Sequence, residues 1–191
     1  MQQVIVQKFG GTSVGSGERI AAVAEIIKNE AEMNTVVVVV SAMAGETDRL
    51  IELSKLFGDN PNTREFDALI STGEKVSASL LAMALNSLGL KAKSYSAAQV
   101  SLKTTSNFSK AKILDIDKAK MEEILADGSI PIITGFQGIT ETGEVTTLGR
   151  GGSDTTAVAI AASLKANRCD IYTDVDGIYT TDPRIVPNAK K

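Results

Sequence analysis

Short apolar, β-branched runs alternate along this chain with segments whose apolar residues repeat at helical spacing. Residues 4–9 and 36–40 form the first two runs, and the second is unbroken valine, as expected for a parallel strand covered on both faces. Between them, from residue 20 to residue 31, apolar side chains recur every three or four positions. This pattern predicts a strand, a helix and a second, fully buried strand.

The same alternation continues along the chain. A short helix is expected around residues 50–57, ended by Gly58. A helical pattern covers residues 64–88, with Gly73 as a possible point of division, and one face of it carries an apolar stripe of Val76, Leu80, Ala84 and Leu88. The other predicted elements are strands at 91–96, 130–134, 169–173 and 178–180, helices around 121–125 and after 154, and a hairpin over 138–147. The polar residues 101–110 predict no element.

Strands that alternate with helices across short loops predict an α/β fold, a three-layer sandwich with a largely parallel central sheet. In such sheets ligands bind beyond the carboxyl ends of the strands. Clusters of glycine and polar residues follow the predicted strands at 10–13, 41–47, 135–138, 149–154 and 173–177. We therefore expect these clusters to share one edge of the sheet, within a single domain covering residues 1–191.

Composition narrows the classes of function. Among 191 residues there is no histidine, which excludes a Ser-His-Asp hydrolase and a typical zinc site. A net charge of -3, with scattered lysines, does not favour a nucleic-acid partner. The single cysteine, Cys169, cannot form an internal disulfide, and the longest apolar run, 36–40, is too short to cross a membrane. These features lead us to expect a soluble, cytoplasmic protein.

The turn at Gly10 and Gly11 joins the first strand to the first helix. Glycine lets the backbone approach an oxygen-rich ligand, and free N–H groups at a helix start point toward negative charge. Lys8, at the end of the strand, adds a full positive charge. The turn therefore predicts a phosphate site, although a lysine at a strand edge can also be merely solvated.

A second glycine turn covers residues 149–152 and places Arg150 between glycines, where its guanidinium can bind a carboxylate with two hydrogen bonds. Residue types alone leave the neighbouring positions open. Asp154 is a natural helix cap, and Glu74 reads equally well as a solvated helix charge. Ser41 and Thr47 are typical turn residues.

Three stretches together resemble the signature motifs of the aspartate kinases, which have the amino-acid-kinase fold. They are KFGGTS at 8–13, LGRGGSD at 148–154 and TDVDGIYTTDPR at 173–184, in the family's order and rough spacing. The resemblance implies transfer of the γ-phosphoryl group of ATP, with Mg²⁺, to the side-chain carboxylate of L-aspartate. The product, 4-phospho-L-aspartate, leads to diaminopimelate, lysine, threonine and methionine.

The resemblance also implies roles for individual residues. Lys8 would contact the transferring phosphoryl group, with Asp154 as a second catalytic residue. The implied substrate-binding residues are Ser41, Thr47, Glu74, Arg150, Gly151, Gly152, Ser153 and Asp154. The implied nucleotide-binding residues are Lys8, Phe9, Gly10, Gly11, Ser13, Thr173, Asp174, Tyr179 and Arg184. No protein metal site is expected, because phosphates supply most of the ligands of Mg²⁺. The acidic pair Asp174 and Asp176 could hold Mg²⁺ through water, but a tight turn is the better explanation of the two residues.

Two alternatives remain at this point. One is a related kinase of the same fold, acting on acetylglutamate, glutamate or a nucleotide. The other is a non-catalytic fragment that binds ligands or serves assembly, since residues 185–191 close no element and the family's regulatory domains are absent. If the chain is cut, we expect little turnover from it alone. Relatives commonly form dimers, so the full protein is expected to be a homo-oligomer.

Overall fold

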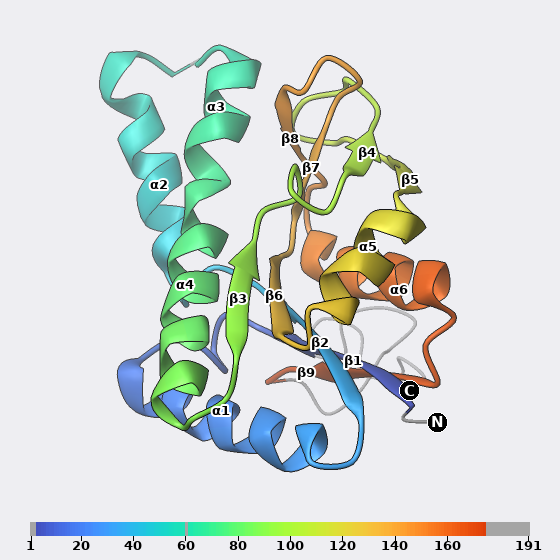
Figure 1. Cartoon of the computed structure of the whole chain (residues 1–191). Helices are drawn as coiled ribbons and strands as arrows, with labels where there is room; N and C mark the ends of the chain where they lie inside the picture. Colours follow the sequence, from blue (N-terminus) through green and yellow to red (C-terminus); the bar gives the residue numbers. More distant parts are fainter. Residues whose placement is uncertain (1–2, 60, 175–191) are drawn as a thin grey trace, which may run out of the picture.

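The computed structural model describes residues 3–59 and 61–174, and a five-stranded parallel sheet lies at its centre (Figure 1). The sheet order is β3-β6-β2-β1-β9. The strands are β1 Val4–Phe9, β2 Thr35–Val40, β3 Ala92–Tyr95, β6 Ile130–Thr134 and β9 Arg168–Tyr172. Every neighbouring pair is parallel, so all five strands end at one edge. The glycine turns after β1 and before α6 both lie near this edge.

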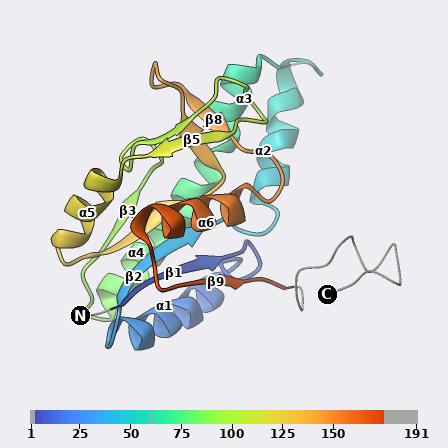
Figure 2. The same cartoon turned by 90° about the vertical axis from the view of Figure 1, so that its right-hand side faces the viewer.

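Helices cover both faces of this sheet, which confirms the three-layer sandwich. The helices α1 (Gly17–Ala31) and α4 (Thr72–Ser87) cover one face, and α5 (Lys118–Ala126) and α6 (Gly152–Leu164) cover the other; Figure 2 shows α1 and α6 on opposite sides. The valines of β2 explain the arrangement. Alternate side chains of a strand point to opposite faces, and Val36, Val38 and Val40 pack with α1 and α4 while Val37 and Val39 pack with α5 and α6.

A smaller unit stands beyond the carboxyl edge of the central sheet (Figure 1). It contains a four-stranded sheet, in the order β5-β4-β7-β8, and the helices α2 (Glu46–Ser54), η1 (Lys55–Phe57) and α3 (Thr63–Ile70). The predicted hairpin is confirmed as β7 (Gln137–Ile139) and β8 (Val145–Thr147). The sequence missed β4 (Leu102–Thr104) and β5 (Ile113–Ile116), because both are only three or four residues long and their pairing is interrupted after Lys103.

The helical stretch from α3 to α4 requires two corrections. It breaks at Ser71, two residues before the expected Gly73. The predicted apolar stripe is also not the buried one: Val76 and Leu80 are 46% and 38% exposed, whereas Leu81 and Leu85 are fully buried. Apolar residues occupy more than one face of α4, so spacing alone did not identify the packed face.

Residues Thr63–Ser87, taken as one helical stretch, pass a length and composition test for a membrane span. Half of the most apolar window is buried inside the fold, and core helices pass the same test. The predicted turn at 174–177 and strand at 178–180 lie outside the described residues, apart from Asp174.

Candidate active site

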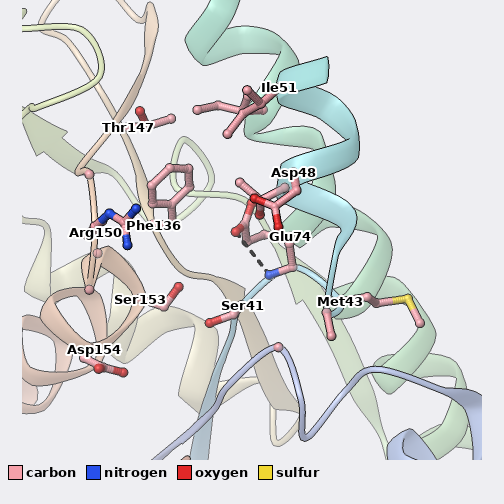
Figure 3. Close-up of a pocket in the computed structure, with 18 of the residues that line it drawn as sticks. Ser41, Met43, Asp48, Ile51, Glu74, Phe136, Thr147, Arg150, Ser153 and Asp154 are labelled. Carbon is pink, nitrogen blue, oxygen red and sulfur yellow. Dashed lines mark hydrogen bonds between the residues drawn. The ribbon is translucent and has the colours of Figure 1, made fainter. Parts of the chain in front are cut away.

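A pocket of about 590 Å³ lies beyond the carboxyl ends of β1, β2 and β6 (Figure 3). One wall comes from α2, α3 and α4, and the other from β8 and the turn that leads into α6. Both glycine turns predicted from the sequence contribute to it, through Gly11 and through residues 149–152. Segments about 140 positions apart in the chain therefore meet at one cavity, as the sequence led us to expect.

The first glycine turn packs tightly against the loop after β2. A Cβ at Gly11 would lie 2.8 Å from the carbonyl oxygen of Ala42, so a side chain there would displace backbone. The same loop is joined to the turn by a hydrogen bond from the Ala44 N–H to the Gly11 carbonyl, at 3.1 Å. Gly11 is thus required by the close approach of two backbones at the mouth of the pocket.

Lys8 brings a buried positive charge to the pocket. The residue is 7% exposed, and its Nζ lies 2.6 Å from Oδ1 of Asp154 in the first turn of α6. The Asp154 side chain is 47% exposed, so the ion pair opens to solvent on one side. Helix α6 begins after Gly151 without a side-chain cap, and Asp154 pairs with Lys8 instead; the capping role expected for Asp154 is therefore wrong.

The second glycine turn depends on left-handed backbone. Gly149 and Gly151 have φ values of 81° and 71°, which other residues adopt only with strain. Arg150, between them, is exposed and lies at the pocket wall with Ser153 (Figure 3). Gly152 opens α6, where a Cβ would lie 3.0 Å from the Phe136 ring. The turn therefore presents a guanidinium and the N-terminus of a helix to the same cavity.

Glu74 supplies a buried carboxylate from α4. It is 3% exposed; its Oε1 accepts a hydrogen bond from the Ala42 N–H at 3.1 Å, and its Oε2 has no partner within the described residues. Burial raises the pKa of Glu74 from its ordinary 4.5 to about 7, which the backbone hydrogen bonds only partly oppose. A buried oxygen without a partner at a pocket wall is suited to a cationic group of a ligand.

Ser41 and Thr47 line the pocket at the end of β2 and in the first turn of α2. The sequence did not single out other lining residues, which include Met43, Asp48, Ile51, Phe66, Ile70, Ser109, Phe136 and Thr147. Phe136 belongs to the cluster 135–138 noted after a predicted strand, but nothing in its residue type indicated a φ of 68°. Most of the others come from α2, α3 and the small sheet, whose packing the sequence did not reveal.

Several expected nucleotide-binding residues lie away from this cavity. The ring of Phe9 is fully buried, stacks on Tyr172 with ring centres 4.5 Å apart and does not line the pocket; its expected role in nucleotide binding stays a prediction. Ser13 does not line the pocket; its N–H donates to the Gly10 carbonyl. Thr173 and Asp174 are exposed just beyond β9, whose Tyr172 carbonyl accepts from the Gly10 N–H at 3.1 Å.

Tyr179 and Arg184, the remaining expected nucleotide contacts, lie outside the described residues. Within residues 3–59 and 61–174, no group of three histidine, cysteine, aspartate or glutamate side chains is arranged to hold a metal ion. The described pocket is therefore best characterised on the side of Arg150 and Glu74.

This arrangement can be compared with known proteins. Residues 3–191 match the model of the amino acid kinase family. An aspartate kinase of Pseudomonas putida is 57% identical over 189 residues, which is 98% of this chain and 46% of that protein. The chain thus spans about half the length of the curated relatives it matches.

Solved structures agree with this assignment. Aspartate kinase from Synechocystis superposes with a TM-score of 0.81 at 50% identity, over 98% of this chain and 31% of that one. Escherichia coli aspartokinase III, solved in complex with aspartate and ADP, gives 0.81 at 30% identity, over 99% and 53%. The match to the family model over residues 3–191, together with the structural similarity to aspartate kinases, shows that this chain belongs to the amino acid kinase family.

Proposed function

We propose that this chain provides the phosphoryl-transfer site of an aspartate kinase, which transfers the γ-phosphoryl group of MgATP to the side-chain carboxylate of L-aspartate and yields 4-phospho-L-aspartate and ADP. The observation that carries the proposal is the charge arrangement of the pocket. Arg150 and Lys8 supply two cations, and Glu74 supplies a buried carboxylate with a free oxygen. The relative solved with aspartate and ADP supports the same substrate pair.

Each charged group of aspartate has a group of opposite charge available in the pocket. The guanidinium of Arg150 suits the α-carboxylate, since it can bind both oxygens at once. The free Oε2 of Glu74 suits the α-ammonium group. The side-chain carboxylate would then point toward Lys8, where the phosphoryl group would be transferred.

The reaction asks little covalent chemistry of the protein. A carboxylate oxygen of aspartate attacks the γ-phosphorus, and the bond to the bridging oxygen of ADP breaks. Because the attacking carboxylate is already ionised at neutral pH, no general base is needed, and the absence of histidine is no obstacle. Catalysis rests on alignment and on positive charge near the phosphoryl oxygens, which Lys8 and the N-terminus of α6 can provide.

The residues present also fit MgATP. Gly10 is buried and Gly11 is half-buried, and a Cβ at Gly10 would lie 3.4 Å from the lysine Nζ, so the lack of a side chain at Gly10 keeps space free beside Lys8. Mg²⁺ takes most of its ligands from phosphates and water, so a single nearby carboxylate such as that of Asp154 is sufficient. When bound, the ion would neutralise charge on the phosphates.

The test is an assay of ADP release by the complete protein, with aspartate and with glutamate as acceptors. We expect turnover with aspartate and a large loss with glutamate, because one extra methylene shifts the acceptor carboxylate away from the phosphoryl group. Turnover of glutamate without turnover of aspartate would contradict the substrate assignment.

Three wider proposals accompany this function. The product would feed the synthesis of diaminopimelate, lysine, threonine and methionine. A cytoplasmic location is supported by the single cysteine, which forms no internal disulfide. A homo-oligomeric full protein rests on the resemblance to the family, and size measurement of the complete protein would test it.

A further inference from the structure

A fully buried carboxylate, Asp67 on α3, lies behind the pocket wall. Its Oδ2 accepts hydrogen bonds from the backbone N–H groups of Ser109 and Thr147, at 2.8 and 2.7 Å. Its Oδ1 accepts from the hydroxyl groups of the same two residues, at 3.0 and 2.9 Å. Among the ion pairs of the described residues, none involves Asp67. Four donors from two other segments thus satisfy one buried carboxylate.

The contact fixes an unusual backbone. Ser109, in the loop between β4 and β5, has a φ of 65°, a left-handed conformation that strains a non-glycine residue. Such a conformation persists only where the surroundings determine it, and both the N–H and the hydroxyl of Ser109 are held by Asp67. The same loop is tied to β8 by the Ala111 N–H, which donates to the Thr147 carbonyl at 2.9 Å.

The three segments joined by Asp67 form part of the pocket. Phe66 and Ile70 beside it on α3 line the cavity, as do Ser109 and Thr147. The loop of Ser109 also abuts the second glycine turn, since a Cβ at Gly149 would lie 3.4 Å from the Ser109 carbonyl oxygen. The loop that Asp67 holds therefore lies directly against the turn that carries Arg150.

We propose that Asp67 is a positioning residue for the acceptor substrate: by clamping α3, the Ser109 loop and the end of β8 together, it sets the position of Arg150 over the pocket. The proposal rests on the proposed function, because it assigns Arg150 to the α-carboxylate of aspartate. The hydrogen bonds of Asp67 within the described residues go to Ser109 and Thr147 and not to the Gly10–Gly11 turn, so the nucleotide side should be insensitive to it.

The substitution Asp67→Ala removes the clamp itself. Alanine has no accepting oxygen, whereas asparagine could turn its amide oxygen toward the two backbone N–H groups and its NH₂ group toward the two hydroxyls, which also accept. In the alanine variant all four buried donors lose their partner, and the Ser109 loop loses the contact that holds its left-handed backbone. In the complete protein we expect KM for aspartate to rise about tenfold or more, with KM for ATP unchanged, since small displacements of a substrate clamp have large effects.

A matched control is Asp127→Ala, the same change at an exposed aspartate that pairs with Lys91 and Lys93 and does not line the pocket. It should leave both KM values unchanged. If Asp67→Ala does not fold, Ser109→Ala removes one hydroxyl donor, leaves the backbone bonds in place and should raise KM for aspartate by a smaller factor. Equal rises in both KM values, or no rise for aspartate in a folded variant, would overturn the proposal.

A second readout does not depend on the substrate. In Asp67→Ala, hydrogen exchange at the amides of Ser109 and Thr147 should accelerate, while the Ser41 amide, which donates to the Phe9 carbonyl on β1, keeps its protection. If the wild-type protein does not turn over aspartate, the proposed function fails, yet the clamp is still supported by faster exchange at these two amides. Unchanged exchange there would refute the clamp, whatever the substrate.

Discussion

The ion pair of Lys8 and Asp154 connects the two glycine turns at the level of single side chains. Its charges lie 2.6 Å apart, with the lysine buried and the aspartate half exposed. An exposed carboxylate can be solvated when its partner is removed, whereas a phosphoryl group arriving at the pocket would gain the full charge of the lysine. The pair therefore points to a role in the reaction more than to one in stability.

Replacement of Lys8 tests whether the ion pair serves the reaction rather than stability. Lys8→Ala should lower kcat by about 100-fold to 1000-fold, because the charge that meets the transferring phosphoryl group is lost. Thermal unfolding should change little, since water replaces the lysine beside Asp154. Lys93→Ala, which removes an exposed lysine on β3, serves as the control and should leave kcat unchanged. Near-normal turnover by Lys8→Ala would show that another group supplies the charge.

Glu74 predicts a dependence on pH. Its pKa of about 7 lies above the ordinary 4.5, so the folded protein binds more protons than the unfolded chain between these values, and stability falls as pH rises through that window. An ammonium ligand needs the ionised carboxylate. Affinity for aspartate should therefore weaken as pH falls below about 7, by up to tenfold per pH unit, as measured by calorimetry.

The variant Glu74→Gln separates the two effects. The amide oxygen can still accept from the Ala42 N–H, but no buried charge remains. At pH 8 the variant should be more stable than the wild type by up to about 3 kcal/mol, and near pH 4.5 the two should agree. Its aspartate affinity should be low and flat with pH. A wild-type pH profile in the variant would assign the titration to another group.

Some of these residues could be predicted from the sequence and others could not. Lys8, Arg150 and the glycines stand in motifs whose chemistry is local, and the structure brings them to one cavity. Asp67 gave no signal, because its four hydrogen-bond donors come from Ser109 and Thr147, which lie 42 and 80 positions away. Asp154 was assigned a capping role from its place at the start of a helix. Only the fold shows that its carboxylate pairs with Lys8 from the distant strand β1.

At the level of helices and strands, the pattern of apolar residues predicted the central sheet well, because strands buried on both faces have a strong signal. It failed for β4, which is three residues long with one apolar residue, and for β5, which is apolar but only four residues long and therefore too short for its period to be recognised. It also failed for the packed face of α4. That face includes Gly73, Glu74 and Ser77. Because none of these three residues is a large apolar one, a search for apolar spacing does not detect them.

Gly73 offers a prediction at this level. A Cβ there would lie 2.8 Å from the Cβ of Ala42, in the loop that also receives Glu74. Gly73→Ala should destabilise the protein by about 1–3 kcal/mol through overpacking, despite the better helix propensity of alanine. Gly17→Ala is the matched control, since Gly17 is also in a first helical turn and has nothing within 4 Å of its added Cβ. Equal effects on denaturant unfolding would contradict the packing argument.

The described part of the molecule combines a sandwich with a smaller unit (Figure 1), and residues of both line the pocket. The sequence predicted the edge of the sheet that carries the pocket, because parallel strands bring their carboxyl ends together. It could not predict the wall formed by α2, α3 and the small sheet, which depends on contacts between distant segments such as Arg64 on α3 and Glu144 near β8, 2.6 Å apart.

A ligand that bridges both walls should stabilise the protein as a unit. At 100 times its Kd, aspartate is expected to add about 2.7 kcal/mol to the free energy of unfolding. Succinate, which lacks the ammonium group, should add much less in the wild type, because Oε2 of Glu74 would remain without a partner. In Glu74→Gln the advantage of aspartate over succinate should disappear. Thermal unfolding at pH 8 measures all four combinations, and an equal response to both ligands in the wild type would remove Glu74 from the substrate site.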